Sequence, residues 1–278
     1  MHFPKLTIAV FAFAILAAPA PAAAVCSNAT LKGLWGYYHG RPLGTFNVRK
    51  LVGQFTADGQ GNLSGSWTLN STGVISTGTF TGSYAIAANC TGTLTFSSED
   101  QSPANFNIVF DAANQGFQMI QSDNGYAQSG FGMAQGVATC GRTGNKQVFA
   151  ANLLGVVYPS DDIEDMVGQL EFNEKGNVSG TATLSLAGTI SSVAVTGTYA
   201  ESADCTGTLQ ITPAGFSPMN FNTVVVSGGH ELILIETDSN TFVAGTAQEQ
   251  GRICRHPDRG LGAFLAHDCS DISITPAP

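Results

Sequence analysis

The sequence predicts an all-β protein built of two tandem antiparallel up-and-down β-barrels, each with about eight strands. Three observations favour this fold class: apolar residues alternate with hydroxyl-bearing residues over short segments, turn residues separate these segments, and the second half of the chain repeats the first. Short connections between neighbouring segments indicate a meander, and closing a meander into a barrel removes its exposed edges. A pair of β-sandwiches is the alternative architecture.

The N-terminus has the pattern of a secretory signal peptide, which we assign to residues 1–24. A short basic start precedes a mostly apolar run over residues 6–18, and Ala22 and Ala24 place small residues at the two positions that a signal peptidase reads. The apolar run is too short to span a bilayer comfortably. We therefore expect an exported protein with no integral membrane span.

An internal duplication organises the rest of the chain. Residues 51–136 align without a gap with residues 166–251. A repeat of this length has the size of a domain and is too long for a solenoid unit. We therefore expect a first barrel at residues 25–139, a second barrel at residues 140–251 and a disulfide-closed tail at residues 252–278.

Each predicted strand of the first copy is a short segment with one apolar face. Leu63, Trp67 and Leu69, for example, alternate with serine and threonine, and a glycine-rich turn at residues 58–62 precedes them. The same faces recur in the second copy. The expected strands of the first copy lie near residues 34–39, 50–57, 62–69, 74–86, 91–97, 105–111, 116–122 and 126–134.

Charged side chains are few, and acidic ones outnumber basic ones. The 278 residues include 20 acidic and 11 basic side chains, which give a formal net charge of −9. Phosphate backbones need a basic surface, so the composition argues against nucleic-acid binding. Serine and threonine suit the water-facing side of a strand, which explains how the chain manages with 11% charged residues.

One segment, found in both copies, resembles a known group of proteins. Residues 82–94 and 197–209 share the pattern G-[ST]-Y-x4-[DN]-C-T-G-T-L, and the sequence Gly33-Leu34-Trp35 is similar to the G-x-W start of a lipocalin, although residues 148–150 lack it. The pattern resembles a motif of uncharacterised exported bacterial proteins with lipocalin-like, or calycin-like, barrels. The resemblance implies a barrel that binds small apolar molecules in the periplasm or outside a bacterial cell.

Ionisable side chains are scarce on the inward faces. Predicted strands two to six of both copies carry no Asp, Glu, His, Lys or Arg there, whereas general acid–base catalysis needs such a group beside the substrate. We therefore expect no catalytic residue, metal site or cofactor, and an enzyme is the less favoured interpretation. Tyr84 and Tyr199 are candidate ligand contacts through their hydroxyls; core tyrosines bonded to a backbone carbonyl at the barrel end are the alternative.

The two predicted lumens differ in side-chain volume. An eight-stranded barrel is just wide enough to be filled by side chains or to hold one small ligand. We predict that the first barrel is filled and that the second keeps a ligand cavity; a second barrel that flattens until its walls touch is the alternative. Besides Tyr199, the candidate ligand contacts are Leu170, Ala182, Val195, Ile211, Thr223, Val225 and Leu232, in place of Phe55, Trp67, Phe80, Phe96, Ile108, Phe110 and Phe117.

Loop charges also diverge between the copies. Arg49 and Lys50 align with Glu164 and Asp165. Opposite charges at equivalent places favour contact between the two barrels through these residues, or different ligand preferences at the two mouths. Solvated loops that drifted after the duplication are the other explanation.

Six cysteines in an exported chain favour three disulfides. We prefer the pairing that leaves each barrel self-contained over one that links the barrels and the chain ends. The preferred bonds are Cys26–Cys90, Cys140–Cys205 and Cys254–Cys269, and the alternative ones are Cys90–Cys140, Cys205–Cys254 and Cys26–Cys269.

Three functions are compatible with these features. The first is a binding protein that holds a small apolar ligand, more readily in the second barrel. The second is a structural or surface-interaction protein with solid barrels. The third is a barrel isomerase or cyclase, which shapes its substrate and needs few titratable groups. The sequence does not choose between the first two.

Overall fold

The structure is a computed structural model, and it describes ten parts of the chain. The predicted signal peptide at residues 1–24 and the predicted tail, with Cys254 and Cys269, lie outside the described residues. Those described are residues 25–41, 49–99, 101–111, 113, 115–126, 128–136, 140, 146–157, 160 and 162–250.

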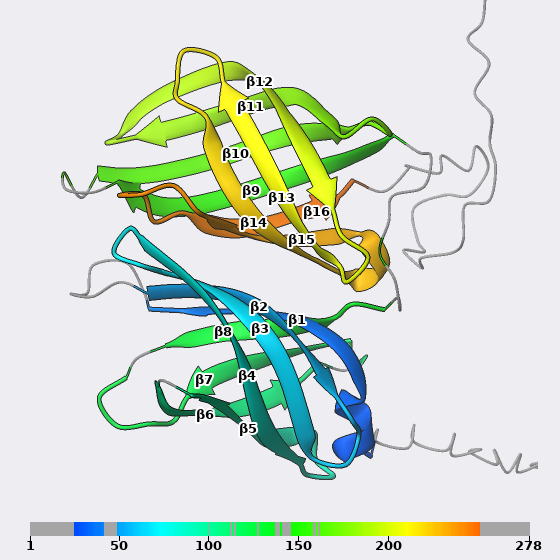
Figure 1. The fold of residues 1–278 in the computed structure, drawn as a ribbon. Helices are drawn as coiled ribbons and strands as arrows, with labels where there is room; N and C mark the ends of the chain where they lie inside the picture. The colour runs from blue at the N-terminus through cyan, green and yellow to red at the C-terminus, as the bar shows by residue number, and fades with distance from the viewer. Residues whose placement is uncertain are drawn as a thin grey trace, which may run out of the picture.

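The described residues form two closed antiparallel barrels of eight strands each, in sequence order, as predicted. Figure 1 shows the two barrels one above the other. The strands of the first barrel are β1 (Gly33–Gly40), β2 (Arg49–Ala57), β3 (Asn62–Ser71), β4 (Val74–Ile86), β5 (Thr91–Ser98), β6 (Gln101–Phe110), β7 (Gly116–Gln121) and β8 (Ser129–Ala134). Those of the second are β9 (Gln147–Val157), β10 (Asp162–Phe172), β11 (Asn177–Leu186), β12 (Thr189–Glu201), β13 (Thr206–Pro213), β14 (Met219–Val226), β15 (Glu231–Glu236) and β16 (Ala244–Glu249).

The strand boundaries differ most from the predicted ones at β6. This strand begins at Gln101 instead of near residue 105, and it contains Pro103, which lacks a backbone donor. The structure accommodates the proline beside an irregularity in the ladder, because the β5–β6 register shifts between Phe96 and Ser98.

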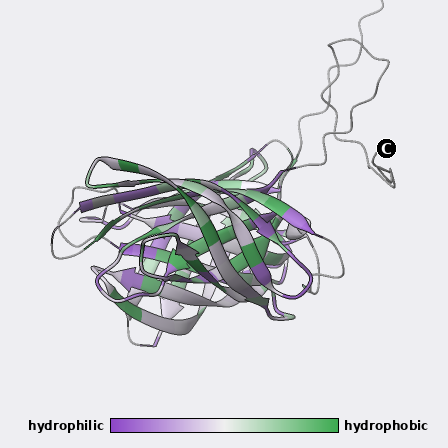
Figure 2. Cartoon of the chain, turned by 90° about the horizontal axis from the view of Figure 1, so that it is seen from above, coloured by the Kyte–Doolittle hydropathy of each residue, from purple (hydrophilic) through white to green (hydrophobic). Residues whose placement is uncertain are grey.

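Closure of each sheet comes from the pairing of its first and last strands. In the first barrel Trp35 to Gly40 of β1 pair with Ala134 to Ser129 of β8, and in the second β16 pairs with β9. Every strand therefore has two neighbours, and alternate residues point into the lumen. Hydrophobic and hydrophilic residues are accordingly interspersed along the strands in Figure 2.

A short 3-10 helix, η1 (Asn28–Leu31), closes one end of the first barrel. The side chain of Leu31 is fully buried, and the indole nitrogen of Trp35 donates a hydrogen bond of 2.8 Å to the Leu31 carbonyl. We call this the closed end of the first barrel. The opposite end, where β1 ends and β2 begins, is called the mouth.

Two disulfides fix the described cysteines within their own barrels. Cys26 is bonded to Cys90 and Cys140 to Cys205, with Cα–Cα distances of 5.0 and 4.8 Å. This is the self-contained pairing that the sequence favoured, and it excludes the pairing of Cys90 with Cys140. Disulfides of this kind persist in oxidising compartments.

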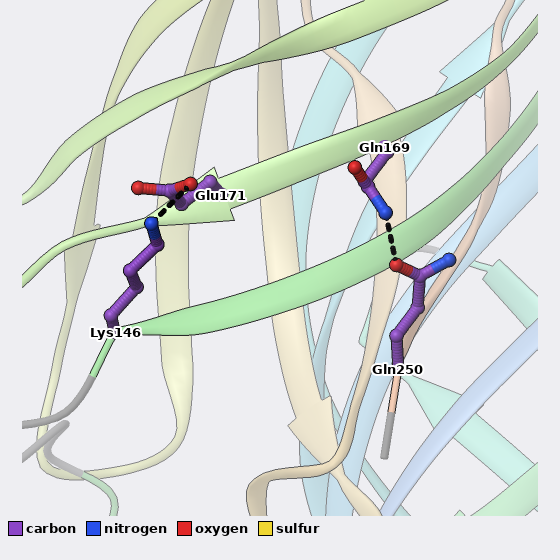
Figure 3. Close-up of polar contacts among 4 residues, drawn as sticks. All are labelled: Lys146, Gln169, Glu171 and Gln250. Carbon is purple, nitrogen blue, oxygen red and sulfur yellow. Dashed lines mark hydrogen bonds and ion pairs between the residues drawn. The ribbon is translucent and has the colours of Figure 1, made fainter. Parts of the chain in front are cut away.

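Polar contacts on the outer face hold the start and end of the second barrel (Figure 3). Lys146, just before β9, forms an ion pair of 2.7 Å with Glu171 of β10, and the side-chain amide of Gln169 donates to Gln250, just after β16. Exposed pairs of this kind stabilise a fold only slightly. They attach the residues just before β9 and just after β16 to β10.

The two barrels contact each other through outward-facing apolar side chains. β1 and β2 lie against β14 and β15, as Figure 1 shows. Val52 of the first barrel packs there with Val226 and Ile233 of the second, all three being almost fully buried. A Cβ on Gly36 would lie 2.4 Å from Val226 Cγ1, so glycine at this position permits the close approach of β1 to β14.

A buried lysine also crosses between the barrels. The ammonium group of Lys50 donates hydrogen bonds to the carbonyls of Leu154 and Phe242 and lies 4.7 Å from the centre of the Phe242 ring. Burial lowers its pKa to about 8, while the negative charges of Glu236 and Asp165 act in the opposite direction. Burial likewise raises the pKa of Glu236 to about 8.

We expect the first disulfide to stabilise the first barrel specifically. Replacing Cys26 and Cys90 with alanine lowers the free energy of unfolding by about 4 kcal/mol, the chain-entropy value for a loop of this length. Both tryptophans of the chain lie in the first barrel, so tryptophan fluorescence during urea unfolding reports on that barrel. Replacing Cys140 and Cys205 is the matched control. Equal effects of the two double variants on the fluorescence transition contradict this prediction.

Glu236 gives the stability a defined pH dependence. Its pKa is raised from 4.5 to about 8 in the folded state, so its contribution is fully present below pH 4.5 and is lost as the pH rises through about 8. The stability of the natural protein relative to Glu236→Gln therefore falls between pH 5 and pH 8, by at most about 1.4 kcal/mol per pH unit. Urea unfolding followed by circular dichroism at several pH values measures this difference, and a difference independent of pH contradicts it.

Candidate ligand-binding site

The site is a cavity of about 630 Å³ at the mouth of the first barrel. Inward-facing residues of β1 to β5 form its apolar wall, and polar side chains surround its entrance. The apolar wall consists of Tyr37, Leu51, Trp67, Leu69, Phe80 and Phe96. The polar entrance consists of His39, Arg49, Gln121, Asp123, Tyr126 and Gln128.

Two glycines allow aromatic rings to lie flat against this wall. A Cβ on Gly53 would lie 2.7 Å from Cε1 of Tyr37, and a Cβ on Gly78 would lie 2.5 Å from Cζ2 of Trp67. Each ring thus occupies the space that a side chain on the neighbouring strand would fill. The Tyr37 ring also reaches across the lumen to Phe80 of β4 and Phe96 of β5, at centroid distances of 6.0 and 5.2 Å.

The expectation that the first barrel is filled and that the second keeps the ligand cavity stays a prediction, but the first barrel has a cavity at its mouth. The rings fill the closed end, where Trp35 contacts Phe110 and Phe117 at centroid distances of 5.9 and 5.4 Å. At the mouth, Ala104 is small, whereas the equivalent residue of the second barrel is Met219. The comparison of seven positions missed this reversal in size.

The predicted ligand contacts of the second barrel are core residues. Leu170, Val195, Ile211 and Leu232 are at most 1% exposed and pack in one apolar cluster. That cluster also contains Ala182, Val225 and Tyr199. Thr223 is also buried and lines a groove of about 510 Å³ between the barrels. Their role as ligand contacts stays a prediction.

The two candidate tyrosines use their hydroxyls within the protein. The Tyr84 hydroxyl accepts a hydrogen bond of 2.7 Å from the backbone N–H of Gly59 and donates one of 3.3 Å to the carbonyl of Asn28, at the closed end. The Tyr199 hydroxyl donates to Glu201 at 3.0 Å. The structure does not bring Tyr84 to the cavity of its own barrel.

His39 is a buried titratable side chain of the cavity lining, and the sequence argument missed it. His39 is 8% exposed, its ring stacks with Tyr37, and its Nδ1 lies 2.9 Å from Oε1 of Gln128. An amide oxygen accepts, so Nδ1 carries the proton of the neutral ring and Nε2 carries the lone pair. Burial lowers the pKa of His39 to about 4, and the nearby charge of Arg49 acts in the same direction.

The alternation along β1 was the available signal for His39. Trp35, Tyr37 and His39 share one face of the strand. The predicted absence of ionisable inward-facing residues applied to strands two to six, and His39 lies on the first strand. At neutral pH the histidine supplies a hydrogen-bonding group without a charge.

Two arginines lie at the entrance on the strand ends that flank the β1–β2 connection. Arg49 begins β2 and is half-buried, and the guanidinium of Arg41 lies 5.5 Å from the centre of the Tyr126 ring. Burial lowers the pKa of Arg49, and the positive charge of Arg41 lowers it further. The Nε atom of Arg41 is buried and has no hydrogen-bond partner.

Asp123 at the entrance is fully engaged by neighbouring amides. Its Oδ2 accepts hydrogen bonds from the backbone N–H of Asn105 at 2.8 Å and from the side chain of Gln121 at 2.9 Å, and its Oδ1 accepts one from the Asn105 side chain at 2.7 Å. These bonds lower its pKa. Asn220 and Asp238 make the same backbone and side-chain bonds in the second barrel, which marks the pair as part of the shared frame.

Neither metal ligands nor a membrane helix emerge from the described parts of the chain. No group of three or more His, Cys, Asp or Glu side chains in these parts is arranged to hold a metal ion. No helix in them is long and apolar enough to cross a membrane.

Comparisons with known proteins give no family for this chain. No protein-family model matches it. No curated protein matches it in sequence. Solved structures similar to it include kievitone hydratase from Nectria haematococca, with 8% identity, a TM-score of 0.26 and coverage of 81% of this chain and 93% of that one. A second is CghA, with 9% identity, a TM-score of 0.27 and coverage of 84% of this chain and 94% of that one. A third is a putative AttH from Nitrosomonas europaea, with 9% identity, a TM-score of 0.25 and coverage of 78% of this chain and 92% of that one. TM-scores of this size carry no argument about fold or function.

Proposed function

We propose that this protein binds a small apolar ligand in the mouth of its first barrel. The observation that carries the proposal is the cavity of about 630 Å³, with an aromatic and aliphatic wall and a few polar groups at its entrance. Cavities of this size and composition are typical of small-molecule sites. The proposal places the ligand in the first barrel, whereas the sequence favoured the second.

The wall offers most of its free apolar surface at Leu51 and Trp67, since Tyr37, Leu69, Phe80 and Phe96 are at most 9% exposed. Trp67 is only partly buried, and the aromatic rings of Tyr37, Phe80 and Phe96 lie at centroid distances of 4.8 to 6.0 Å from one another. Removing apolar surface from water is the main source of affinity for such ligands. A flat, largely apolar molecule would lie against these rings and cover Trp67.

We further propose that the protein acts outside the cytoplasm, in the periplasm or as a secreted protein. The two disulfides support an oxidising compartment. The signal-peptide pattern of residues 1–24 points to the same compartment.

We also propose that charge complementarity between Lys50 and Asp165 holds the two barrels in one orientation; of the other two residues predicted for this contact, Arg49 lines the mouth of the first barrel and Glu164 is its equivalent in the second. The hydrogen bonds of Lys50 to second-barrel carbonyls support this, as does the attraction between Lys50 and Asp165. Removing or reversing a buried charge is costly because its partners lose their compensation. The orientation would keep both mouths on one side of the molecule, where Gly73 and Asn240 meet.

Ligand binding is tested by exchanging one residue between the barrels. Ala104→Met gives the first barrel the side chain that the second carries at this position, and it fills part of the cavity. We expect it to weaken binding of the neutral fluorescent probe N-phenyl-1-naphthylamine by roughly tenfold or more, since about 1.4 kcal/mol of apolar contact corresponds to that factor. Fluorescence titration measures the affinity.

The reverse exchange, Met219→Ala, is the matched control. It enlarges the core of the second barrel and leaves the proposed site intact, so the affinity for the probe stays within twofold of the natural protein. Absence of probe binding to the natural protein contradicts the proposed function. Binding that Ala104→Met leaves unchanged contradicts the proposed site.

The interbarrel proposal is tested by Lys50→Glu. An acidic side chain at this position loses the hydrogen bonds to the carbonyls of Leu154 and Phe242 and repels Asp165, so we expect a larger radius of gyration in small-angle X-ray scattering with the secondary structure retained. Lys146→Glu is the control, because Lys146 pairs with Glu171 on the outer face of the second barrel. A radius unchanged by Lys50→Glu contradicts the proposal.

A further inference from the structure

We propose that the ligand of the first barrel is an anionic amphiphile: an aromatic or otherwise apolar body with one acidic group, held at the entrance by the guanidinium groups of Arg49 and Arg41. This inference rests on the proposed function, because it names the chemical class of ligand for the same cavity. It goes further by assigning the acidic group a place and a binding partner.

The first argument is that neither guanidinium group has an acidic partner among the residues that the structure describes. Among the described residues, the ion pairs are Lys146 with Glu171 and His230 with Glu249, and neither involves an arginine. Arg49 is half-buried and lines the cavity, and Arg41 has a buried Nε atom without a hydrogen-bond partner. Partly buried charges without a partner are unfavourable, and the two positive charges also repel each other. An anion at the entrance would relieve both costs.

The second argument is that the one acidic side chain of the cavity lining is already occupied. Asp123 accepts hydrogen bonds from Asn105 and Gln121 with both of its oxygens. The equivalent Asp238 binds Asn220 in the same manner although the second barrel has no arginine at this end. Asp123 therefore stabilises the strand ends of the barrel, as Asp238 does in the second copy, and it does not neutralise the arginines.

The third argument is the reversal of charge between the two mouths. The residue equivalent to Arg49 is Glu164, and the residue equivalent to Gln121 is Glu236, which burial keeps protonated up to a pKa of about 8. The second mouth also receives Lys50 from the first barrel. In the described part of the chain, positive charge without an acidic partner thus occurs at the mouth that has the cavity.

The geometry assigns separate parts of the ligand to separate parts of the cavity. The apolar body would lie against Trp67, Phe80 and Phe96, and the acidic group would face Arg49 at the entrance. His39 is neutral at pH 7, so it adds no charge to the inner wall. A bidentate guanidinium–acid contact is stronger and more directional than a contact with lysine.

The experiment compares two probes that share one apolar body. N-phenyl-1-naphthylamine is neutral, and 8-anilinonaphthalene-1-sulfonate carries the same aromatic rings with an added sulfonate. We expect the natural protein to bind the sulfonate at least about tenfold more tightly, because hydrogen bonds to charged groups are worth about 1.5–3 kcal/mol. The affinity ratio of the two probes, measured by fluorescence titration, is the readout.

Arg49→Gln is expected to lower the affinity for the sulfonate about tenfold and to leave the affinity for the neutral probe within twofold. Arg49→Lys keeps the charge and retains part of the preference. Lys175→Gln, at an exposed turn of the second barrel, makes the same change in net charge and should leave the ratio unchanged. Circular dichroism verifies that each variant is folded.

The outcomes separate this inference from the proposed function. If the neutral probe binds but the ratio is near one, or if Arg49→Gln leaves the ratio unchanged, the anionic ligand class is wrong and the binding function stands. If neither probe binds the natural protein, the proposed function fails and the inference fails with it. A ratio that falls equally in Lys175→Gln assigns the effect to net charge and overturns the role of Arg49.

Discussion

Closure of the backbone hydrogen-bond ladder is the constraint on which the rest of this structure depends. Once β1 pairs with β8, and β16 with β9, each strand residue is committed to the lumen or to the outer surface. A slip of one residue would turn the apolar set outward. The turns, the disulfides and the amide-bonded aspartates at the strand ends all hold this register in both copies.

The same frame carries two different interiors because its inward positions are free to vary in size and charge. Ala104 faces an open mouth where Met219 faces a packed core, and His39 stands where the second copy has Leu153. Glycines at positions 53 and 78 leave room for the rings of Tyr37 and Trp67 on the neighbouring strands.

The barrels contact each other where their outer faces carry apolar side chains that are removed from water. Many outward positions of β3, β4 and β5 carry serine or threonine, but β14 and β15 present Val226 and Ile233, which need apolar cover. β1 supplies it by approaching closely at Gly36. Lys50 is buried in the process and retains hydrogen bonds to two carbonyls, which reduces the cost of its desolvation.

The sequence by itself determined the all-β class, the duplication and most strand positions, and it favoured the pairing of Cys26 with Cys90 and of Cys140 with Cys205 that the structure shows. These depend on local periodicity, turn residues and repeat symmetry, all of which are visible along one chain. Only the tertiary structure decided that the first barrel has the open mouth. That cavity depends on how rings such as Trp67 lie against neighbouring strands and on which side chains converge at one barrel end, and neither property is encoded in any single segment.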